Sequence, residues 1–292
     1  MRSIPPQKEL QKILFDEEAC TTYLVEIGAV YDEINCEACG TLMKLNFNRK
    51  TFRCTRKTCR KELTMWKGSF FYAHRMPCCD VMNMAYLWLA GATFKTLLHI
   101  GKHSSKTVTA FISYFRQLVT SSLDDADTII GGPGITVEID ESKIAKRKYN
   151  RGHMVTGSWV VGGIEREGGK RIFVKSVANR NAESLKQIIL EHVRPGTTII
   201  TDYWRGYDWI DQNENYIHQK VNHSRNFKDP ETGAHTNTIE GTWAGIKSNI
   251  PKRNRTEGEI NSHIFYYIWR KQNKNDLWGA FISALREVHY DN

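Results

Sequence analysis

The sequence predicts an α/β protein in which a small cysteine-bearing segment and a helical region precede a larger domain built on a mixed sheet. Three observations carry this expectation. Two closely spaced cysteine pairs lie within residues 36–59, apolar residues recur at helical spacing through 80–120, and short β-type runs alternate with amphipathic helical segments after residue 130. A chain of 292 residues, of which 40% are hydrophobic, is long enough for two or three domains and is not disordered throughout.

Charge and hydropathy narrow the class of partner. The 41 Lys and Arg residues exceed the 32 Asp and Glu residues, which gives a formal net charge of +9. Such an excess favours a polyanionic partner, most often nucleic acid, although ordinary solubility charge explains it equally well. No run of eighteen or more apolar residues occurs, and the N-terminus lacks the basic-then-apolar layout of a secretion signal. We therefore expect neither a membrane partner nor secretion.

Four of the seven cysteines form two pairs, Cys36-x2-Cys39 and Cys54-x4-Cys59. Two short-spaced pairs separated by a hairpin are typical of a zinc ribbon, in which each pair sits on a tight knuckle beside a tetrahedral ion. Gly40 follows the first pair, where a knuckle commonly needs a positive φ. We expect a closed, structural zinc site; the alternative is four buried free thiols. The odd total argues against a disulfide framework, and Cys20, Cys78 and Cys79 are interpreted as structural.

The predicted ribbon is also basic. We expect its cations to contact the DNA backbone, and the alternative is an ordinary solvated face. The candidate DNA-binding residues here are Arg49, Lys50, Arg53, Arg56, Lys57 and Arg60.

Residues 80–120 contain two or three helical periods, and GKHSSKTVTAF within them predicts a turn followed by an N-capped helix with Lys106 in its first turn. This layout is typical of a helix-turn-helix DNA reader, although any small helical bundle fits the pattern as well. The expected organisation is an N-terminal helical segment at 1–33, the ribbon at 34–66, the helical DNA-binding region at 67–124, an α/β domain at 130–274 and a C-terminal helix at 275–292.

The element order of the α/β domain is distinctive. Three antiparallel strands, the last two joined by the turn EREGG, come first. A helix, a strand, a further helix-strand step and closing helices follow. The strands are expected at 135–144, 158–164, 171–177, 197–202 and 216–223, and the helices at 182–193, 235–250 and 257–274. This is the order of an RNase H-like α/β fold.

Three acids lie where such a fold brings side chains together. Asp140 lies on the first strand, Asp202 ends the strand expected beside it, and Glu240 lies at the edge of the buried face of a helix. Their shared charge is destabilising unless divalent ions neutralise it, so we expect a site for two hard divalent cations. Glu138 and Glu141 compete for the first position; Glu138 lies a full pleat earlier and Glu141 points to the opposite face of a straight strand.

Cations flank these acids, and a cationic rim around a metal-requiring acidic centre suits a phosphodiester enzyme. The rim residues are Lys143, Lys146, Arg147, Lys148, Arg151, Lys247, Lys252 and Arg253. Tyr203, Trp204 and Trp243 are candidates for stacking on splayed bases, although core packing is the commoner role for Trp243.

The motifs ITVEIDESKIAKRKYNRG, WVVGGIER, TTIITDYWRGY and FKDPETGAHTNTIEGTWAGIK resemble those of the DDE transposases of the Merlin group and their bacterial insertion-sequence relatives. The resemblance covers roughly residues 34–274 and includes the order ribbon, helical region, catalytic domain. It implies that Asp140, Asp202 and Glu240 are the catalytic, metal-binding triad, and that His235 and Asn237 help to shape the site.

The resemblance further implies cut-and-paste transposition of double-stranded DNA at terminal inverted repeats with Mg²⁺ or Mn²⁺. Because two ends must be joined, a homodimer or higher oligomer is expected. The alternatives are a domesticated, DNA-binding descendant without mobilisation activity, or a structure-selective nuclease on the same fold. The expected location is the nucleus in a eukaryote, and the cytoplasm or nucleoid in a bacterium.

Overall fold

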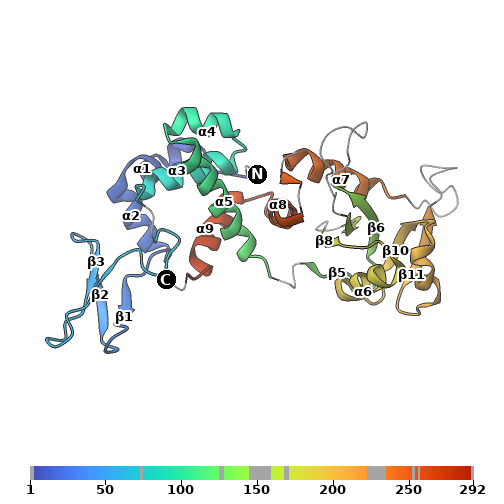
Figure 1. Ribbon diagram of the computed structural model, residues 1–292, viewed down its shortest axis with the longest axis horizontal. Helices are drawn as coiled ribbons and strands as arrows, with labels where there is room; N and C mark the ends of the chain where they lie inside the picture. Colours follow the sequence, from blue (N-terminus) through green and yellow to red (C-terminus); the bar gives the residue numbers. More distant parts are fainter. Residues whose placement is uncertain are drawn as a thin grey trace. The chain divides into compact units, whose positions relative to one another are not determined.

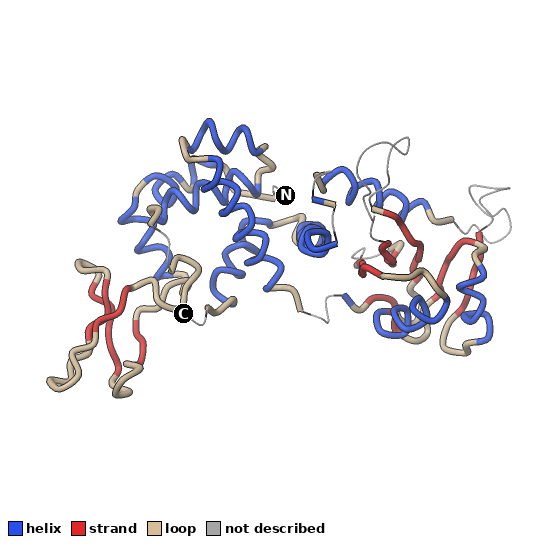
Figure 2. The backbone as a smooth tube through the Cα atoms, in the orientation of Figure 1, coloured by secondary structure: helices blue, strands red, loops and turns tan. Residues whose placement is uncertain are grey.

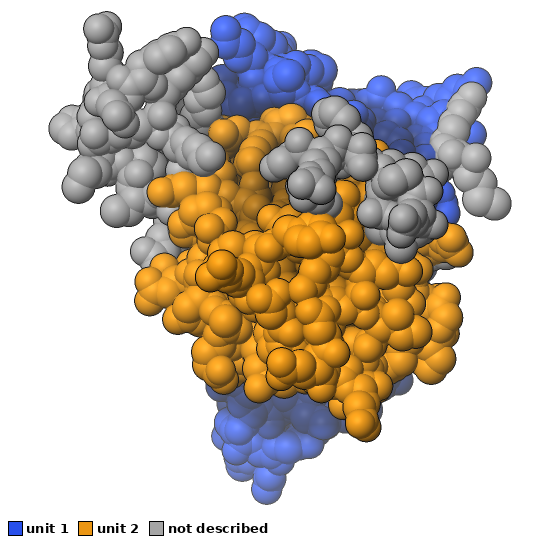
Figure 3. Space-filling view, turned by 90° about the vertical axis from the view of Figure 1, so that its right-hand side faces the viewer, with its two compact units in different colours: residues 1–122, 273–292 blue, residues 123–272 orange. Residues whose placement is uncertain are grey.

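The computed structural model divides the chain into two compact units (Figures 1 and 3). Unit 1 comprises residues 1–122 and 273–292, and unit 2 comprises residues 123–272. The structure describes residues 3–72, 75–124, 128–144, 159–167, 171–221, 235–251, 254–255 and 257–290. The C-terminal segment therefore belongs to the same unit as the N-terminal part of the chain.

The ribbon in unit 1 is a small antiparallel sheet whose strands appear in red in Figure 2. The hairpin expected around residues 42–53 is present, and one further short strand lies on each side of it. Met43 and Phe52 are fully buried beneath it. The strands are β1 (Glu33–Asn35), β2 (Leu42–Asn46), β3 (Thr51–Arg53) and β4 (Glu62–Thr64), hydrogen-bonded in that order.

Helices form the rest of unit 1. The buried ring of Phe115 on α5 is in contact with Phe70, Trp88 and Phe281, with ring centroids 5.6–5.9 Å apart. This aromatic core joins four separate stretches of sequence, including the C-terminal helix α9. The helices are η1 (Gln7–Glu9), α1 (Gln11–Phe15), α2 (Glu17–Glu26), α3 (Cys78–Leu89), α4 (Phe94–Gly101), α5 (Ser105–Ser121) and α9 (Leu277–Glu287).

The turn between α4 and α5 has the form that the sequence predicts. Lys102 has a φ of 53°, which ends α4, and the Ser104 side chain accepts a hydrogen bond of 3.1 Å from the backbone N–H of Thr107. Lys106 is exposed in the first turn of α5. None of the helices in the described part of the chain combines the length and apolar character that a membrane span requires.

Unit 2 is built on a five-stranded sheet with the order β11-β10-β6-β7-β8. β6, β7 and β8 form an antiparallel meander, whereas β10 and β11 run parallel to β6. The strands are β6 (Thr136–Lys143), β7 (Trp159–Glu165), β8 (Ile172–Val177), β10 (Thr198–Asp202) and β11 (Ile217–Val221).

Helices cover both faces of this sheet. The α6 helix (Ala182–His192) and η3 (Arg205–Gln212) pack on the face that receives Val137 and Ile139. α7 (Asn237–Asn249) and α8 (Glu257–Gln272) pack on the opposite face, with Ile239, Trp243 and Ile264 among their buried residues. Because strand side chains alternate, Glu138 and Asp140 point toward the α7 face.

The elements expected after residue 130 are confirmed in type and order. The sequence predicts a helix-strand step after residue 202 without bounds for its helix, and η3 (Arg205–Gln212) and β11 form that step. The two-stranded parallel pair of β5 (Ile130–Gly131) and β9 (Val193–Arg194) is not predicted, because two residues are too few for a periodic pattern.

Two adjacent glycines in β7 allow large side chains to lie directly on the sheet. A Cβ at Gly162 would stand 2.6 Å from the indole of Trp243, and one at Gly163 would stand 2.4 Å from the ring of Phe173. These residues point to opposite faces, so each face of β7 has a recess for an aromatic ring.

We expect Gly163→Ala to destabilise unit 2 by about 1–3 kcal/mol, because the fully buried Phe173 must shift to admit a methyl group. Urea unfolding measures this change. Gly241→Ala is the matched control, because a Cβ there meets no atom within 4 Å on α7. That variant should be unchanged or up to about 1 kcal/mol more stable. Equal unfolding midpoints for the two variants would contradict the steric argument.

Candidate active site

The three predicted acids lie at one edge of the sheet. The parallel register pairs Ile200 of β10 with Glu138 of β6, so two further residues bring Asp202 beside Asp140. Glu240 lies in the first turn of α7, on the face toward which Asp140 points. The second half of β6, the end of β10 and the start of α7 therefore contribute one carboxylate each.

The charges of both other acids act on the carboxyl group of Asp140. Burial raises the pKa of its carboxyl group, and the charges of Asp202 and Glu240 raise it further. A hydrogen bond of 2.9 Å from the indole Nε1–H of Trp243 lowers the pKa of Asp140 in part. The recess at Gly162 brings that indole close to the strand.

The other two carboxylates are also oriented by neighbouring groups. Asp202 accepts a hydrogen bond of 3.0 Å from the backbone N–H of Trp204, and Glu240 accepts one of 3.1 Å from the Thr236 hydroxyl. In the described part of the chain, only the four ribbon cysteines bring three or more His, Cys, Asp or Glu ligand atoms within 4.8 Å of one another. The ligand atoms of Asp140, Asp202 and Glu240 therefore do not all lie within 4.8 Å of one another.

The structure distinguishes Asp140 from its two competitors. Glu138 is fully buried and is hydrogen-bonded to the start of α7 and to Arg166. Glu141 points to the other face of the sheet, where the Tyr207 hydroxyl donates a hydrogen bond of 2.9 Å to it. Asp140, by contrast, is close enough to Asp202 and Glu240 for the charges of both to raise its pKa.

A second charged cluster lies on the η3 face beside the acids. Burial raises the pKa of Glu141 to about 7, and the charges of Asp140 and Asp202 add to the rise. The guanidinium of Arg180 lies 3.9 Å from Glu141 and is stacked 4.7 Å from the ring of Trp159 and 4.8 Å from that of Trp204. Neither Arg180 nor Tyr207 is predicted from the sequence as part of the site, because no local pattern links them to the acids.

Four of the remaining predicted residues of unit 2 lie in the part that the structure describes. His235 has its Nδ1 atom 3.3 Å from a carboxylate oxygen of Glu138, so it lies against that buried group. Asn237 is exposed at the first position of α7. Lys143 ends β6 and lies over the ring of Trp159 at 5.7 Å, and Lys247 lies in the last turn of α7. Lys146, Arg147, Lys148, Arg151, Lys252 and Arg253 lie outside the described residues.

The ribbon cysteines form a compact cluster. The sulfur atoms of Cys36 and Cys59 are 3.6 Å apart, those of Cys39 and Cys54 are 3.5 Å apart, and all four lie within 4.8 Å of one another. Four thiolates at about 2.3 Å from a tetrahedral zinc ion would be about 3.8 Å apart, so the cluster fits that ion. Gly40 has the expected positive φ of 71°.

Contacts with Thr41 favour the metal-binding form of one thiol. Hydrogen bonds with the hydroxyl and the backbone of Thr41 lower the pKa of the Cys39 thiol to about 6. The surrounding cations Arg49, Arg53, Arg56, Lys57 and Arg60 are exposed, and Lys50 is partly buried, 3.6 Å from Glu17.

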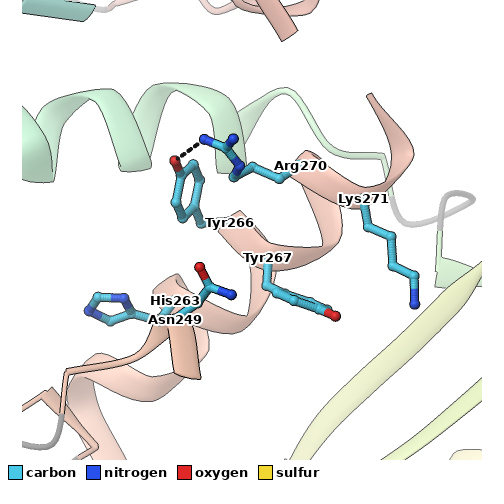
Figure 4. A pocket seen from close by; sticks show the side chains of 6 residues that line it. All are labelled: Asn249, His263, Tyr266, Tyr267, Arg270 and Lys271. Carbon is cyan, nitrogen blue, oxygen red and sulfur yellow. Dashed lines mark hydrogen bonds between the residues drawn. The ribbon is translucent and has the colours of Figure 1, made fainter. Parts of the chain in front are cut away.

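A pocket of about 240 Å³ lies along α8 (Figure 4). Its described lining residues are Asn249, His263, Tyr266, Tyr267, Arg270 and Lys271. Arg270 donates a hydrogen bond of 3.0 Å to the Tyr266 hydroxyl, and Lys271 donates one of 3.2 Å to Thr242. No carboxylate is among these lining residues, so the pocket offers no ligand set for a hard cation.

Comparison with known proteins identifies the class. A protein-family model described as the ISXO2-like transposase domain matches residues 127–268. An uncharacterized transposase-like protein of Haemophilus influenzae is 31% identical over 107 residues, which cover 35% of this chain and 82% of that protein. The chain belongs to the ISXO2-like transposase family. The matched span runs from the start of unit 2 to α8 and includes all three acids.

For this transposase-family chain, we expect one zinc ion per chain, bound in the ribbon. Cys54→Ser should abolish zinc retention, because a closed structural site needs all four thiolates. Elemental analysis of the purified protein measures this. Cys79→Ser is the matched control, since Cys79 lies in α3, outside the cluster, and should leave the zinc content unchanged. Loss of zinc from both variants would contradict the assignment.

A second expected result concerns pH. The pKa of Glu141 in the folded protein, about 7, lies above its ordinary value of 4.5, so folding takes up a proton between these values. The contribution of Glu141 to stability is therefore complete below pH 4.5 and is lost as the pH rises through 7. Glu141→Gln should stabilise the metal-free protein by up to about 3 kcal/mol near pH 8, and much less near pH 4.5.

Urea unfolding at both pH values measures this difference. Glu183→Gln, an exposed residue in the first turn of α6, is the control and should be neutral at both. A Glu141→Gln effect that is the same at the two pH values would contradict a role for the buried charge.

Proposed function

We propose that unit 2 is an RNase H-like DDE transposase domain that cleaves and joins DNA at terminal inverted repeats. Asp140, Asp202 and Glu240 hold two Mg²⁺ or Mn²⁺ ions in this proposal. The observation that carries it is the meeting of these three carboxylates at one sheet edge, close enough for the charges of two of them to raise the pKa of the third.

The topology of unit 2 supports the fold assignment. An antiparallel meander is followed by two strands parallel to the first, and helices cover both faces. The order β11-β10-β6-β7-β8 places the first strand of the domain at the centre of the sheet. The C-terminal ends of β6 and β10 therefore lie side by side, which is where two of the acids lie.

The chain's own groups hold the carboxylates in place. The Trp243 indole orients Asp140, the Trp204 backbone N–H orients Asp202 and the Thr236 hydroxyl orients Glu240. Two divalent cations, when bound, would activate the attacking oxygen and stabilise the leaving oxygen of an in-line displacement at phosphorus.

The reaction has two steps of the same kind. In the first, water attacks a phosphorus atom at the end of the element, the P–O3′ bond breaks, and a 3′-hydroxyl and a 5′-phosphate result. In the second, that 3′-hydroxyl attacks a phosphodiester of the target, forms a new P–O bond and releases a 3′-hydroxyl of the target strand. No oxidant, reductant or nucleotide is consumed.

Positive charge around the chain supports binding of double-stranded DNA. All the ribbon cations except the partly buried Lys50 are exposed, as is Lys106 on α5, and Lys143 ends the strand that carries Asp140. The turn at residues 102–104 and the capped start of α5 support a helix-turn-helix reader of the element ends. A homodimer or larger assembly would bring the two ends of the element together. It would act in the nucleus of a eukaryote, or in the cytoplasm or nucleoid of a bacterium.

The decisive experiment is cleavage of terminal-repeat DNA in the presence of Mg²⁺ or Mn²⁺. Asp202→Ala should lower the cleavage rate by at least about a hundredfold, because it removes a ligand that positions charge at the reacting phosphate. Asp208→Ala is the matched control: Asp208 lies on η3, forms an ion pair of 2.8 Å with Lys220, and should leave the rate near that of the wild type.

Cleavage by the wild type in excess EDTA, or unimpaired cleavage by Asp202→Ala, would refute the proposal. Cleavage without joining to a target would instead identify a nuclease, and specific DNA binding without any cleavage a domesticated DNA-binding protein.

A further inference from the structure

Glu138 is a completely buried carboxylate with an unusually full set of donors. Its Oε1 accepts hydrogen bonds from Arg166 Nε at 2.7 Å and from the Thr238 hydroxyl at 2.9 Å. Its Oε2 accepts from the backbone N–H groups of Thr238 at 2.8 Å and Ile239 at 2.9 Å. A strand residue thus serves as the cap of a helix that begins about a hundred positions later in the chain.

This arrangement is strong for two physical reasons. The first N–H groups of a helix have no partner within the helix, and they carry the positive end of its dipole, so a carboxylate there satisfies both. A buried charge is also costly unless it is paired and hydrogen-bonded, and Arg166 supplies the opposite charge. The start of α7 is therefore held to one point on β6.

Arg166 extends the same connection. Its second guanidinium nitrogen donates a hydrogen bond of 2.6 Å to the backbone carbonyl of His235, just before α7. Arg166 follows directly after β7, so the neighbouring strand is also tied to the segment that leads into the helix.

A second contact fixes α7 along the strand. Glu138 binds residues 238 and 239, and Asp140, two residues further along β6, accepts the hydrogen bond from Trp243. Two residues of a strand span about 6.7 Å, and the four helical residues from 239 to 243 rise about 6 Å. The spacings match, and Glu240 lies between the two fixed points.

We infer that Glu138 is a positioning residue: through the start of α7 it sets where Glu240 stands relative to Asp140, and thereby sets the affinity of the acidic site for divalent cations. This inference rests on the proposed function of Asp140 and Glu240 as metal ligands. Glu138 itself is not a ligand, because both of its oxygens bind the four donors and its side chain is fully buried.

The test compares Glu138→Gln with Glu165→Gln. Glu165 is a second buried glutamate of the same sheet, and it accepts hydrogen bonds from the backbone of Gly131 and Arg171 instead of α7. Both variants remove one buried charge from unit 2. Any general effect of that loss on folding should appear in both, whereas an effect through α7 should appear only in Glu138→Gln.

Metal binding is measured directly with Tb³⁺, whose luminescence is sensitised by the nearby indoles of Trp204 and Trp243, and by the Mn²⁺ concentration that gives half-maximal cleavage. We expect Glu138→Gln to raise the Tb³⁺ concentration for half-maximal luminescence and the Mn²⁺ concentration for half-maximal cleavage, each by roughly tenfold or more. This is the effect typical of groups that support metal ligands. Cleavage should recover in part at high Mn²⁺. Glu165→Gln should keep the wild-type midpoints.

Thr238→Val serves if Glu138→Gln fails to fold. It keeps the volume of the side chain and removes only the hydroxyl donor of 2.9 Å, so a shift of a few-fold in the same direction is expected. Unchanged midpoints in the folded variants, with Asp140→Asn still defective, would overturn the positioning role alone. An equal shift in Glu165→Gln would also overturn it.

Measurements on the wild-type protein alone test the proposed divalent-cation site, on which this inference rests. Wild-type protein that binds no Tb³⁺ and cleaves without a divalent cation would overturn the proposed metal site and the role of Glu138 together, before any variant is compared.

Discussion

Crowding of carboxylates at one sheet edge is the constraint on which the rest of unit 2 depends. Asp140, Asp202 and Glu240 share that edge, and Glu138 and Glu141 flank the first of them. Like charges so close together disfavour the folded state unless each has a partner. Three of these carboxylates accept hydrogen bonds from fixed donors of the protein. Arg166 and the start of α7 donate to Glu138, the Tyr207 hydroxyl donates to Glu141 and the Trp243 indole donates to Asp140.

These hydrogen bonds account for two features of the fold, the glycine in β7 and the place where α7 begins. The indole of Trp243 reaches Asp140 because Gly162 leaves a recess in the neighbouring strand. α7 can begin only where Glu138 accepts its first N–H groups, so the helix that carries Glu240 is positioned by a residue of the sheet. The hydrogen bonds that α7 makes to Glu138 and Asp140 therefore both stabilise these carboxylates and fix the helix on the sheet.

Much of this was accessible from the sequence, and the reason lies in its periodicity. Alternation along ITVEIDES assigned Glu138 and Asp140 to one face, and the order of elements placed Asp202 beside Asp140. The roles of Arg166 and Arg180 were not accessible, because each acts on a carboxylate more than two dozen positions away. The same holds for α9, whose amphipathic pattern does not reveal that it packs against Phe115 in unit 1.

The cysteine cluster of the ribbon and the proposed cation site at Asp140, Asp202 and Glu240 differ in ligand chemistry as well as in place. Four sulfur ligands in the ribbon favour a soft or borderline ion such as zinc and leave no open position, whereas carboxylate oxygens favour hard Mg²⁺ or Mn²⁺. A hard cation held by few protein ligands exchanges readily, and a closed thiolate site holds its ion through the folding of the ribbon. Under the proposed function, each site would select its ion by ligand type, and the acidic site would keep open coordination positions for a phosphodiester.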